Sequence, residues 1–516
     1  MSNIESNKLI AKNTALLYIR MLVILLISLY SSRLLLKELG IDDFGIYGVV
    51  GGIVAMFSSL KTMFSEATER FLNVEIGKNN TLNLIKIFNI SIYVNFIIII
   101  VFVVLVEFLG LWLIEAKLQI PIERHISAYW VFHISVLSAV ITILNVPFDA
   151  CIIAHEKMNI FAFVSVFDSI ARFIIILLLP FWGGDRLILY SVLLLFVVLT
   201  NLFINSIYCY CNFAECRIRK FPVRDIEDKF KEMFSFSGWA FLGNLAFALT
   251  NEGMNILLNI FGGTMANASR TIAYQVRGAI FNLTGNVYTA VKPQAIQSYA
   301  KKEIDRYYTL SFTGGKAVGY FFLLLSIPIY FSLEELLKIW LTEVPQYSIQ
   351  FVTSLFVYMF VRSIHGAIDL FFVTIGKFRY YQIAEFLMLS SSLFLAFVGF
   401  KYYLMPLYGA FMCMAFSEVL NTIVILSLAK SIGNFRVFRF VKDVLIPYCI
   451  MALLCFIICY FLRKMMDNLI YSNINLVFLY VFVSFIAQSL CMFSLGLNKE
   501  EKALFLHIVR HKNGKN

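Results

Sequence analysis

The sequence predicts an all-α polytopic membrane protein with about 14 transmembrane helices, arranged as two pseudo-symmetric six-helix lobes plus two C-terminal helices. Three observations support this fold class. Hydrophobic residues make up 60% of the 516 and charged residues only 15%, whereas soluble chains carry about a quarter charged residues. Apolar windows of about 20 residues, each able to cross roughly 30 Å of hydrocarbon, recur along the whole chain. Two distant segments also share a pattern, which indicates an internal repeat.

The apolar windows fall into two sets of six and a final pair. The first set lies near 12–35, 43–65, 86–110, 126–148, 159–181 and 187–211. The second set lies near 236–260, 269–292, 308–331, 348–373, 380–401 and 405–429, and the pair near 443–462 and 472–494. The first window is longer than a signal peptide and lacks a small-residue cleavage site, so we expect it to be a membrane helix.

This spacing gives four parts: an N-lobe (1–211), a cytoplasmic linker (212–235), a C-lobe (236–430), and the last two helices with a cytoplasmic tail (431–516). Apolar residues recur at helical spacing in the linker, which favours an amphipathic helix on the inner leaflet over a solvated basic linker. Loops that lie on the same side of the membrane as the N-terminus carry roughly three times as many Lys and Arg residues as the loops on the other side. Basic residues accumulate on the cytoplasmic side of membrane proteins. Both termini are therefore expected in the cytoplasm.

The internal repeat is clearest in "PFDACIIAHEKMNIF" at 147–161 and "AIDLFFVTIGKFRYY" at 367–381. Asp149 and Lys157 are eight residues apart, as are Asp369 and Lys377, and the offset is 220. "YGVVGGI" from Tyr47 and "YQVRGAI" from Tyr274 form a weaker match. Because six helices separate the halves, the repeats run in the same direction, which predicts a two-fold axis along the membrane normal and a central cleft.

Polar side chains inside the apolar windows indicate a cavity. A charge facing lipid costs at least about 2.5 kcal/mol, so such groups usually face protein or water. Asn244, Asn251, Asn255 and Asn259 share one helix face, which favours a wetted wall over interhelical hydrogen bonds. Arg20 lies near a helix end, where snorkelling to the interface is the alternative. The complete set of predicted cavity residues is Arg20, Arg277, Asn244, Asn251, Asn255, Asn259, Lys292, Lys316 and Arg362.

Acidic residues suggest gating and ion coupling. In "SEATER", Glu66, Glu69 and Arg70 lie at the cytoplasmic mouth, where they would exchange ion pairs; an ordinary solvated turn is the alternative. The candidates for ion coupling are Asp149, Glu252 and Asp369. Asp168 and Arg172, four residues apart on one helix, are expected to form a structural ion pair.

Several functions find no support in the sequence. Neither a P-loop nor a GxGxxG fingerprint after a strand is present, so ATP is not expected to drive the protein. No paired CxxC motifs suggest a metal site, and no catalytic residues are predicted. The net charge of +11 is attributed to loops beside the anionic inner leaflet rather than to nucleic-acid binding.

The stretch "NTALLYIRMLVILLISLYSSRLLLKELGIDDFGIYGVVGGIVAMFSSL", with "ATERFLNVEIGK" after it, resembles the opening of bacterial O-antigen-type polysaccharide flippases. "NEGMNILLNIFGG" and "ASRTIAYQVRGAIFNLTGNVYTAVKPQAIQSYA" in the second half resemble the same proteins, which belong to the multidrug/oligosaccharidyl-lipid/polysaccharide (MOP) superfamily. The resemblance implies alternating access and flipping of undecaprenyl-diphosphate-linked oligosaccharides across the bacterial inner membrane for lipopolysaccharide biosynthesis. Polysaccharide polymerase and chain-length proteins would be partners, beside membrane lipids.

In the related lipid II flippases, arginines on the first and eighth helices line the central cavity, and Arg20 and Arg277 match them by helix and motif context. The resemblance implies no cofactor and leaves coupling to a proton or sodium gradient open. Distant drug exporters use an acidic cation site on early helices, and helices one and two lack a clear equivalent here. A cation-coupled multidrug or metabolite exporter is the alternative function, and a membrane polysaccharide polymerase or ligase is the third.

Overall fold

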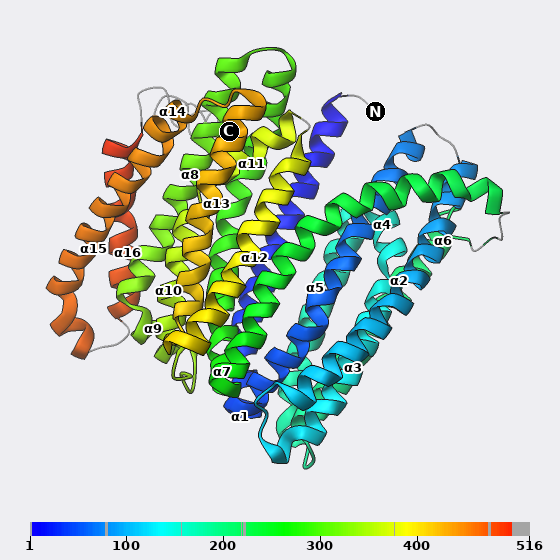
Figure 1. The fold of residues 1–516 in the computed structure, drawn as a ribbon, viewed down its shortest axis with the longest axis horizontal. Helices are drawn as coiled ribbons and strands as arrows, with labels where there is room; N and C mark the ends of the chain where they lie inside the picture. The colour runs from blue at the N-terminus through cyan, green and yellow to red at the C-terminus, as the bar shows by residue number, and fades with distance from the viewer. Residues whose placement is uncertain are drawn as a thin grey trace. The chain divides into compact units, whose positions relative to one another are not determined.

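The computed structural model describes the backbone of residues 3–77, 81–155, 157–217, 219, 223–375, 377–472 and 476–497. Every regular element in these ranges is helical (Figure 1). Nine of the described helices are long and apolar enough to span a membrane, and the bent pair α10 (Ser348–Arg362) and α11 (Gly366–Thr374) is a tenth when it is taken as one span. Two further elements, α1 (Asn3–Gly77) and α7 (Val223–Ala300), are each broken once and so contribute four helical segments. The chain therefore has the fold of a multi-pass membrane protein with the predicted 14 helices.

The breaks in α1 and α7 both occur at glycine. Gly40 has φ 78° and Gly263 has φ 66°, in the region that L side chains rarely adopt. Each glycine lies where the sequence predicts the junction between the first and second helix of a half. Glycine has no Cβ, so it makes this sharp reversal without steric strain.

The chain divides into two compact units, which are described separately. Unit 1 comprises residues 1–272 and 400–407, and unit 2 comprises 273–399 and 408–516. The division between the units thus falls within α7. The predicted lobes are defined by the order of the helices instead, and the boundaries of these lobes stay a prediction.

Unit 1 contains α1 and the first part of α7, with the short turns η1 (Ile122–Arg124) and η2 (Leu179–Phe181). Its other helices are α2 (Thr81–Ala116), α3 (His125–Leu144), α4 (Val146–Ala154), α5 (Met158–Leu178) and α6 (Arg186–Asn212). In this unit α1 packs against α2, α3, α4 and α5, and α3 packs against α6 (Figure 1). Phe88, Phe102 and Phe132 are fully buried in the apolar core between these helices.

Unit 2 contains the rest of α7 and the helices that follow it. They are α8 (Ile304–Phe331), α9 (Leu333–Trp340), α10 (Ser348–Arg362), α11 (Gly366–Thr374), most of α12 (Phe378–Tyr403), α13 (Gly409–Gly433), α14 (Val437–Phe440), α15 (Ile446–Ser472) and α16 (Leu476–Cys491). The π-helical turns η3 (Val441–Leu445) and η4 (Met492–Gly496) adjoin the last three helices. Helix α8 packs against α11, α15 and α16, so the last two long helices belong to this unit.

The repeat found in the sequence is also a repeat of local structure. The Asp149 amide donates to the carbonyl of Asn145 at 3.0 Å, and the Asp369 amide donates to the carbonyl of His365 at the same distance. Eight residues after each aspartate, the backbone amide of a lysine donates five residues back, at 3.0 Å for Lys157 and 3.2 Å for Lys377. The bends between α3 and α4 and between α10 and α11 are therefore equivalent.

Three chain segments of unit 1 meet at Arg124, in the loop before α3. Its guanidinium donates to Asp43 Oδ1 at 2.7 Å and to Asp185 Oδ2 at 2.9 Å. Asp185 also caps α6, because its carboxylate accepts the backbone amides of Leu187 and Ile188. Ser127 donates to the same carboxylate at 2.6 Å. One cation thus ties together the α1 break, the start of α3 and the start of α6.

Candidate functional site

Five of the predicted site residues have side chains outside the described part of the structure: Arg20, Glu66, Arg70, Asn244 and Lys292. Their predicted roles stay predictions. The other ten are placed, and they fall into separate groups within the two units.

The described members of the asparagine face, Asn251, Asn255 and Asn259, are buried inside unit 1. The Asn255 amide donates to the carbonyl of Gly48 at 3.0 Å, and the Asn259 amide donates to Asn267 Oδ1 at 2.6 Å. Asn267 in turn donates to Asn255 Oδ1 at 2.8 Å. These bonds join the two segments of α7 to each other and to α1, as in the interhelical alternative. The role of this face as the wall of a water-filled cavity stays a prediction.

Two cations of unit 2 lie over aromatic rings. The Arg277 guanidinium is 5.1 Å from the ring centroid of Tyr274 and 5.7 Å from that of Tyr358. Lys316 is 2% exposed, and its ammonium lies 6.0 Å from the centroid of Tyr320. The electron-rich ring faces stabilise the positive charges where water is scarce.

The remaining acidic candidates of unit 1 are Glu69 and Glu252. The carboxylate of Glu252 lies 3.8 Å from the Arg270 guanidinium and accepts a 3.4 Å hydrogen bond from Asn255. Arg270 also donates to the carbonyl of Asn251 at 2.6 Å. Glu252 is therefore part of the same buried polar network as the asparagines, and Glu69 is half-buried.

Arg362 is the centre of a buried ionic network in unit 2. Its guanidinium lies 2.7 Å from Glu385 and 3.0 Å from Glu418, and Glu418 is fully buried. His365 lies 3.2 Å from Glu418 and contacts Thr422 at 2.6 Å. Because burying two carboxylates without a cation would be very costly, Arg362 serves here as their counter-ion.

Asp369 lies at the edge of this network, beside Tyr381. The Tyr381 hydroxyl donates to Glu385 at 3.1 Å, so it links Asp369 to the Arg362 pair. Among the described residues, no group hydrogen-bonds the Asp369 Oδ1 atom. Three carboxylates thus face one guanidinium and one imidazole, an arrangement suited to holding a proton.

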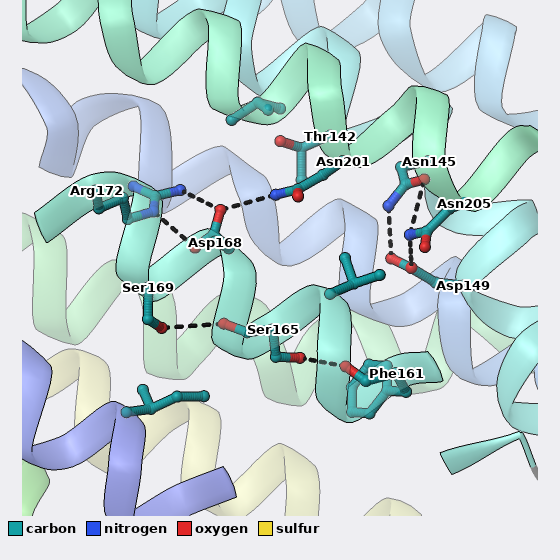
Figure 2. A pocket seen from close by; sticks show the side chains of 13 residues that line it. Thr142, Asn145, Asp149, Phe161, Ser165, Asp168, Ser169, Arg172, Asn201 and Asn205 are labelled. Atoms are coloured by element: carbon teal, nitrogen blue, oxygen red, sulfur yellow. Dashed lines mark hydrogen bonds and ion pairs between the residues drawn. The ribbon is translucent and has the colours of Figure 1, made fainter. Parts of the chain in front are cut away.

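A polar pocket of about 350 Å³ lies inside unit 1, between α1, the α3–α4 bend, α5 and α6 (Figure 2). Its two acidic residues are Asp149 and Asp168, and its one basic residue is Arg172. The pocket is lined by Ile24, Thr142, Asn145, Asp149, Phe161, Val164, Ser165, Asp168, Ser169, Arg172, Val198, Asn201 and Asn205.

Each of the two aspartates of this pocket is the centre of a hydrogen-bonded group (Figure 2). In the first, Arg172 Nε donates to Asp168 Oδ2 at 2.7 Å, and Asn201 donates to Asp168 Oδ1 at 2.8 Å. This confirms the predicted ion pair. In the second, the side chains of Asn145 and Asn205 donate to Asp149 at 3.0 and 2.7 Å. Asp149 thus lies in a pocket rather than in an exposed loop.

Sequence reasoning missed the carboxylates Glu385 and Glu418 and the pocket asparagines. The pairing of Arg362 with two carboxylates depends on which helices are neighbours, which periodicity does not reveal. Two signals were available for the asparagines. Asn201 and Asn205 are four residues apart on one apolar helix, and Asn201 and Asn421 are separated by the offset of the repeat.

Comparisons with solved structures identify the fold. A multidrug resistance MATE family transporter of the MOP superfamily, in its inward-facing conformation, matches with a TM-score of 0.68 at 14% identity over 83% of this chain and 99% of that one. The lipid II flippase MurJ, in an inward closed conformation, matches with a TM-score of 0.68 at 12% identity over 92% of this chain and 98% of that one. This chain is therefore a multi-pass membrane protein with the fold of MOP superfamily transporters.

A MOP superfamily transporter from Pyrococcus furiosus also matches, with a TM-score of 0.60 at 14% identity over 84% of this chain and 96% of that one. No protein-family model matches the sequence, and no curated protein matches it significantly. These three structural neighbours are transporters, and at 12–14% sequence identity the matches show a shared fold.

Proposed function

We propose that this chain is a flippase that moves undecaprenyl-diphosphate-linked oligosaccharide across the bacterial inner membrane, for the synthesis of a surface polysaccharide such as O-antigen. The observation that carries the proposal is an arginine within an apolar helix of a chain that shares the fold of a lipid II flippase. Arg277 lies in the second segment of α7, with its guanidinium over two tyrosine rings, and the fold matches that of the flippase over 92% of this chain.

In the proposed mechanism, Arg277 and Arg20 bind the diphosphate of the lipid carrier. A guanidinium donates two parallel hydrogen bonds to phosphate oxygens, and low local polarity strengthens the attraction. The two lobes alternate between access from the cytoplasm and access from the outside while the lipid tail stays in the bilayer. Both termini are cytoplasmic in this proposal, and polysaccharide polymerase and chain-length proteins act after the flippase.

The buried network around Arg362 is the proposed coupling site. Asp369, Glu385 and Glu418 outnumber the cations they face, so a proton or sodium ion would balance the charge. Release of that ion would leave unpaired buried charge, and a change of conformation would relieve it.

The test of this function is export in living cells. We expect Arg20→Ala and Arg277→Ala each to abolish surface polysaccharide while the protein level stays normal, because the diphosphate loses its counter-charge. Normal export by both variants would contradict the proposal. Arg306→Ala, at an exposed position of unit 2, is the matched control and is expected to export normally.

The second candidate function is a cation-coupled exporter of drugs or metabolites. It is favoured by the partly buried carboxylates Glu252 and Asp369 and by the match to a multidrug transporter fold. A resistance assay with and without a sodium or proton gradient separates the two: gradient-dependent resistance with normal surface polysaccharide in a deletion strain would favour the exporter. If the chain were a polymerase or ligase, mutations in residues 111–125, around the connection between α2 and α3, would change the length of the polysaccharide product.

A further inference from the structure

We propose that the unit 1 pocket around Asp149, Asp168 and Asn205 is a binding subsite for an uncharged sugar ring. The choice of a sugar rests on the proposed function, but the pocket itself defines the chemistry of its ligand. The volume of the pocket, its formal charge and its free hydrogen-bond acceptors each support this assignment.

The volume of the pocket fits a ring rather than a single ion. It measures about 350 Å³. Pockets for organic ligands hold about 300–1,000 Å³, whereas one water molecule occupies only about 30 Å³ of liquid. A bare cation would occupy only a small part of this volume, and water would have to fill the rest.

The charge of the pocket disfavours a phosphate. Asp149 and Asp168 are acidic, and Arg172 is the one basic residue of the lining, so the formal charge is negative. The Arg172 guanidinium is already engaged with Asp168 at 2.7 Å. The ligand of this pocket is therefore not an anion, so it is not the diphosphate that the proposed function assigns to Arg20 and Arg277.

Two buried amide oxygens in the lining accept no hydrogen bond from the described residues, which favours a ligand that donates hydrogen bonds. Asn201 and Asn205 direct their amide nitrogens to Asp168 and Asp149, respectively. Among the described residues, no donor bonds to the Oδ1 atom of either asparagine, although both oxygens are buried. Asn205 is 2% exposed, so an unused acceptor there is costly unless a ligand satisfies it. Sugar hydroxyls are donors of this kind.

The repeat shows why the pocket exists in unit 1. The position 220 residues after Thr142, which lines the pocket, is Arg362. In unit 2 the guanidinium of Arg362 pairs with Glu385 and Glu418. In unit 1 the shorter Thr142 donates to the carbonyl of Ser138 in its own helix, at 2.8 Å. Unit 1 therefore has space for a ligand where unit 2 places a long charged side chain.

The test is binding of free sugars to the purified full-length protein. Saturation-transfer NMR and thermal unfolding would be measured with N-acetylglucosamine and galactose, with glucose 1-phosphate as the anionic comparison. Asn201→Leu and Asn205→Leu each remove one unused acceptor, and Asn201→Leu leaves the Asp149 group intact in case Asn205→Leu does not fold. Asn212→Leu is the matched control, because Asn212 is exposed on the same helix.

We expect saturable binding of a neutral sugar to the wild type and to Asn212→Leu, and binding at least about tenfold weaker in both pocket variants. Equal affinity in wild type and pocket variants, or no binding of any neutral sugar, would overturn the proposal. A stabilisation by sodium alone that the pocket variants lose would also overturn it, in favour of a cation site. Free sugars need no lipid carrier, so failure of glycan export would refute the proposed function and leave this result standing.

Discussion

Arg362 shows how one side chain sets the electrostatics of unit 2. It forms ion pairs with both Glu385 and Glu418, and Glu418 has no exposed surface. A buried pair adds little stability compared with apolar residues of the same size, but loss of one partner leaves a charge without a counter-ion. The network therefore constrains which substitutions this unit tolerates.

Arg362→Met is accordingly expected to destabilise the protein by about 3–5 kcal/mol, because the carboxylates remain buried without their cation. The measurement is thermal unfolding in detergent. The double variant Arg362→Met with Glu418→Gln should recover part of the loss, since one of the unpaired charges is removed. Arg306→Met, in an exposed pair with Glu303, should cost less than about 1 kcal/mol. Equal effects at positions 362 and 306 would show that the network is not buried.

Asp185, in the loop before α6, has a pKa set by its neighbours. Burial raises this pKa, but hydrogen bonds from Ser127, the Ile188 amide and Arg124 outweigh burial and hold it below the ordinary value. A carboxyl whose pKa is lower in the folded state stabilises the fold at pH values above its unfolded pKa. That stability is lost as the pH falls through the folded value.

Asp185→Asn should therefore lower stability by about 1 kcal/mol at neutral pH, since it loses the charged pairing with Arg124 while keeping a capping side chain. The difference in unfolding temperature from the wild type should shrink as the pH falls below about 4, because the carboxyl of the unfolded chain is protonated there and that of the folded protein follows at its lower pKa. A difference that stays constant down to pH 3 would show that the charge of Asp185 does not matter.

Within α1, the second helical segment packs closely on α7. A Cβ on Gly45 would collide with the backbone carbonyl of Thr264, and one on Gly48 would lie 2.8 Å from Thr271 Oγ1. A Cβ on Gly51 would meet no atom within 4 Å. Gly51 therefore has room for a side chain, whereas Gly45 and Gly48 do not.

Alanine substitutions at two of these glycines should have opposite effects. Gly45→Ala forces α1 away from α7 and should destabilise the protein by about 1–3 kcal/mol. Gly51→Ala removes a flexible residue from a helix and should stabilise it by about 0.5–1 kcal/mol. Unfolding temperatures of the two variants measured side by side decide this, and destabilisation by Gly51→Ala would mean that another part of the chain covers this face.

For the molecule as a whole, the sequence was sufficient to predict the helices but not their partners. Apolar length predicted the 14 helices, and the spacing of Asp149 and Asp369 predicted a repeat that the backbone hydrogen bonds also follow. The partners of Asn255 and Asn259 lie on other helical segments, at Gly48 and Asn267. Helical periodicity identifies the polar face of a helix, but the packing of helices decides whether that face meets water or another amide.

The pocket and the network show that equivalent positions of the two units have diverged. Thr142 in unit 1 leaves room in a pocket, and Arg362 in unit 2 forms an ionic network. A single substitution between equivalent positions thus distinguishes a pocket in unit 1 from an ionic network in unit 2. The two proposals assign separate tasks to these sites, sugar recognition to the pocket and ion coupling to the network.

The most direct test of the central claim is the rate of translocation in proteoliposomes that contain undecaprenyl-diphosphate-linked oligosaccharide. Wild-type protein should move the glycan to the opposite leaflet, where an impermeant glycosidase cleaves it. Arg277→Ala should be at least about tenfold slower, because losing roughly 1.4 kcal/mol of phosphate binding in the transition state is enough for that, and Arg277→Lys should retain part of the rate. Equal rates for wild type and Arg277→Ala, or wild-type rates no faster than those of protein-free vesicles, would contradict the account.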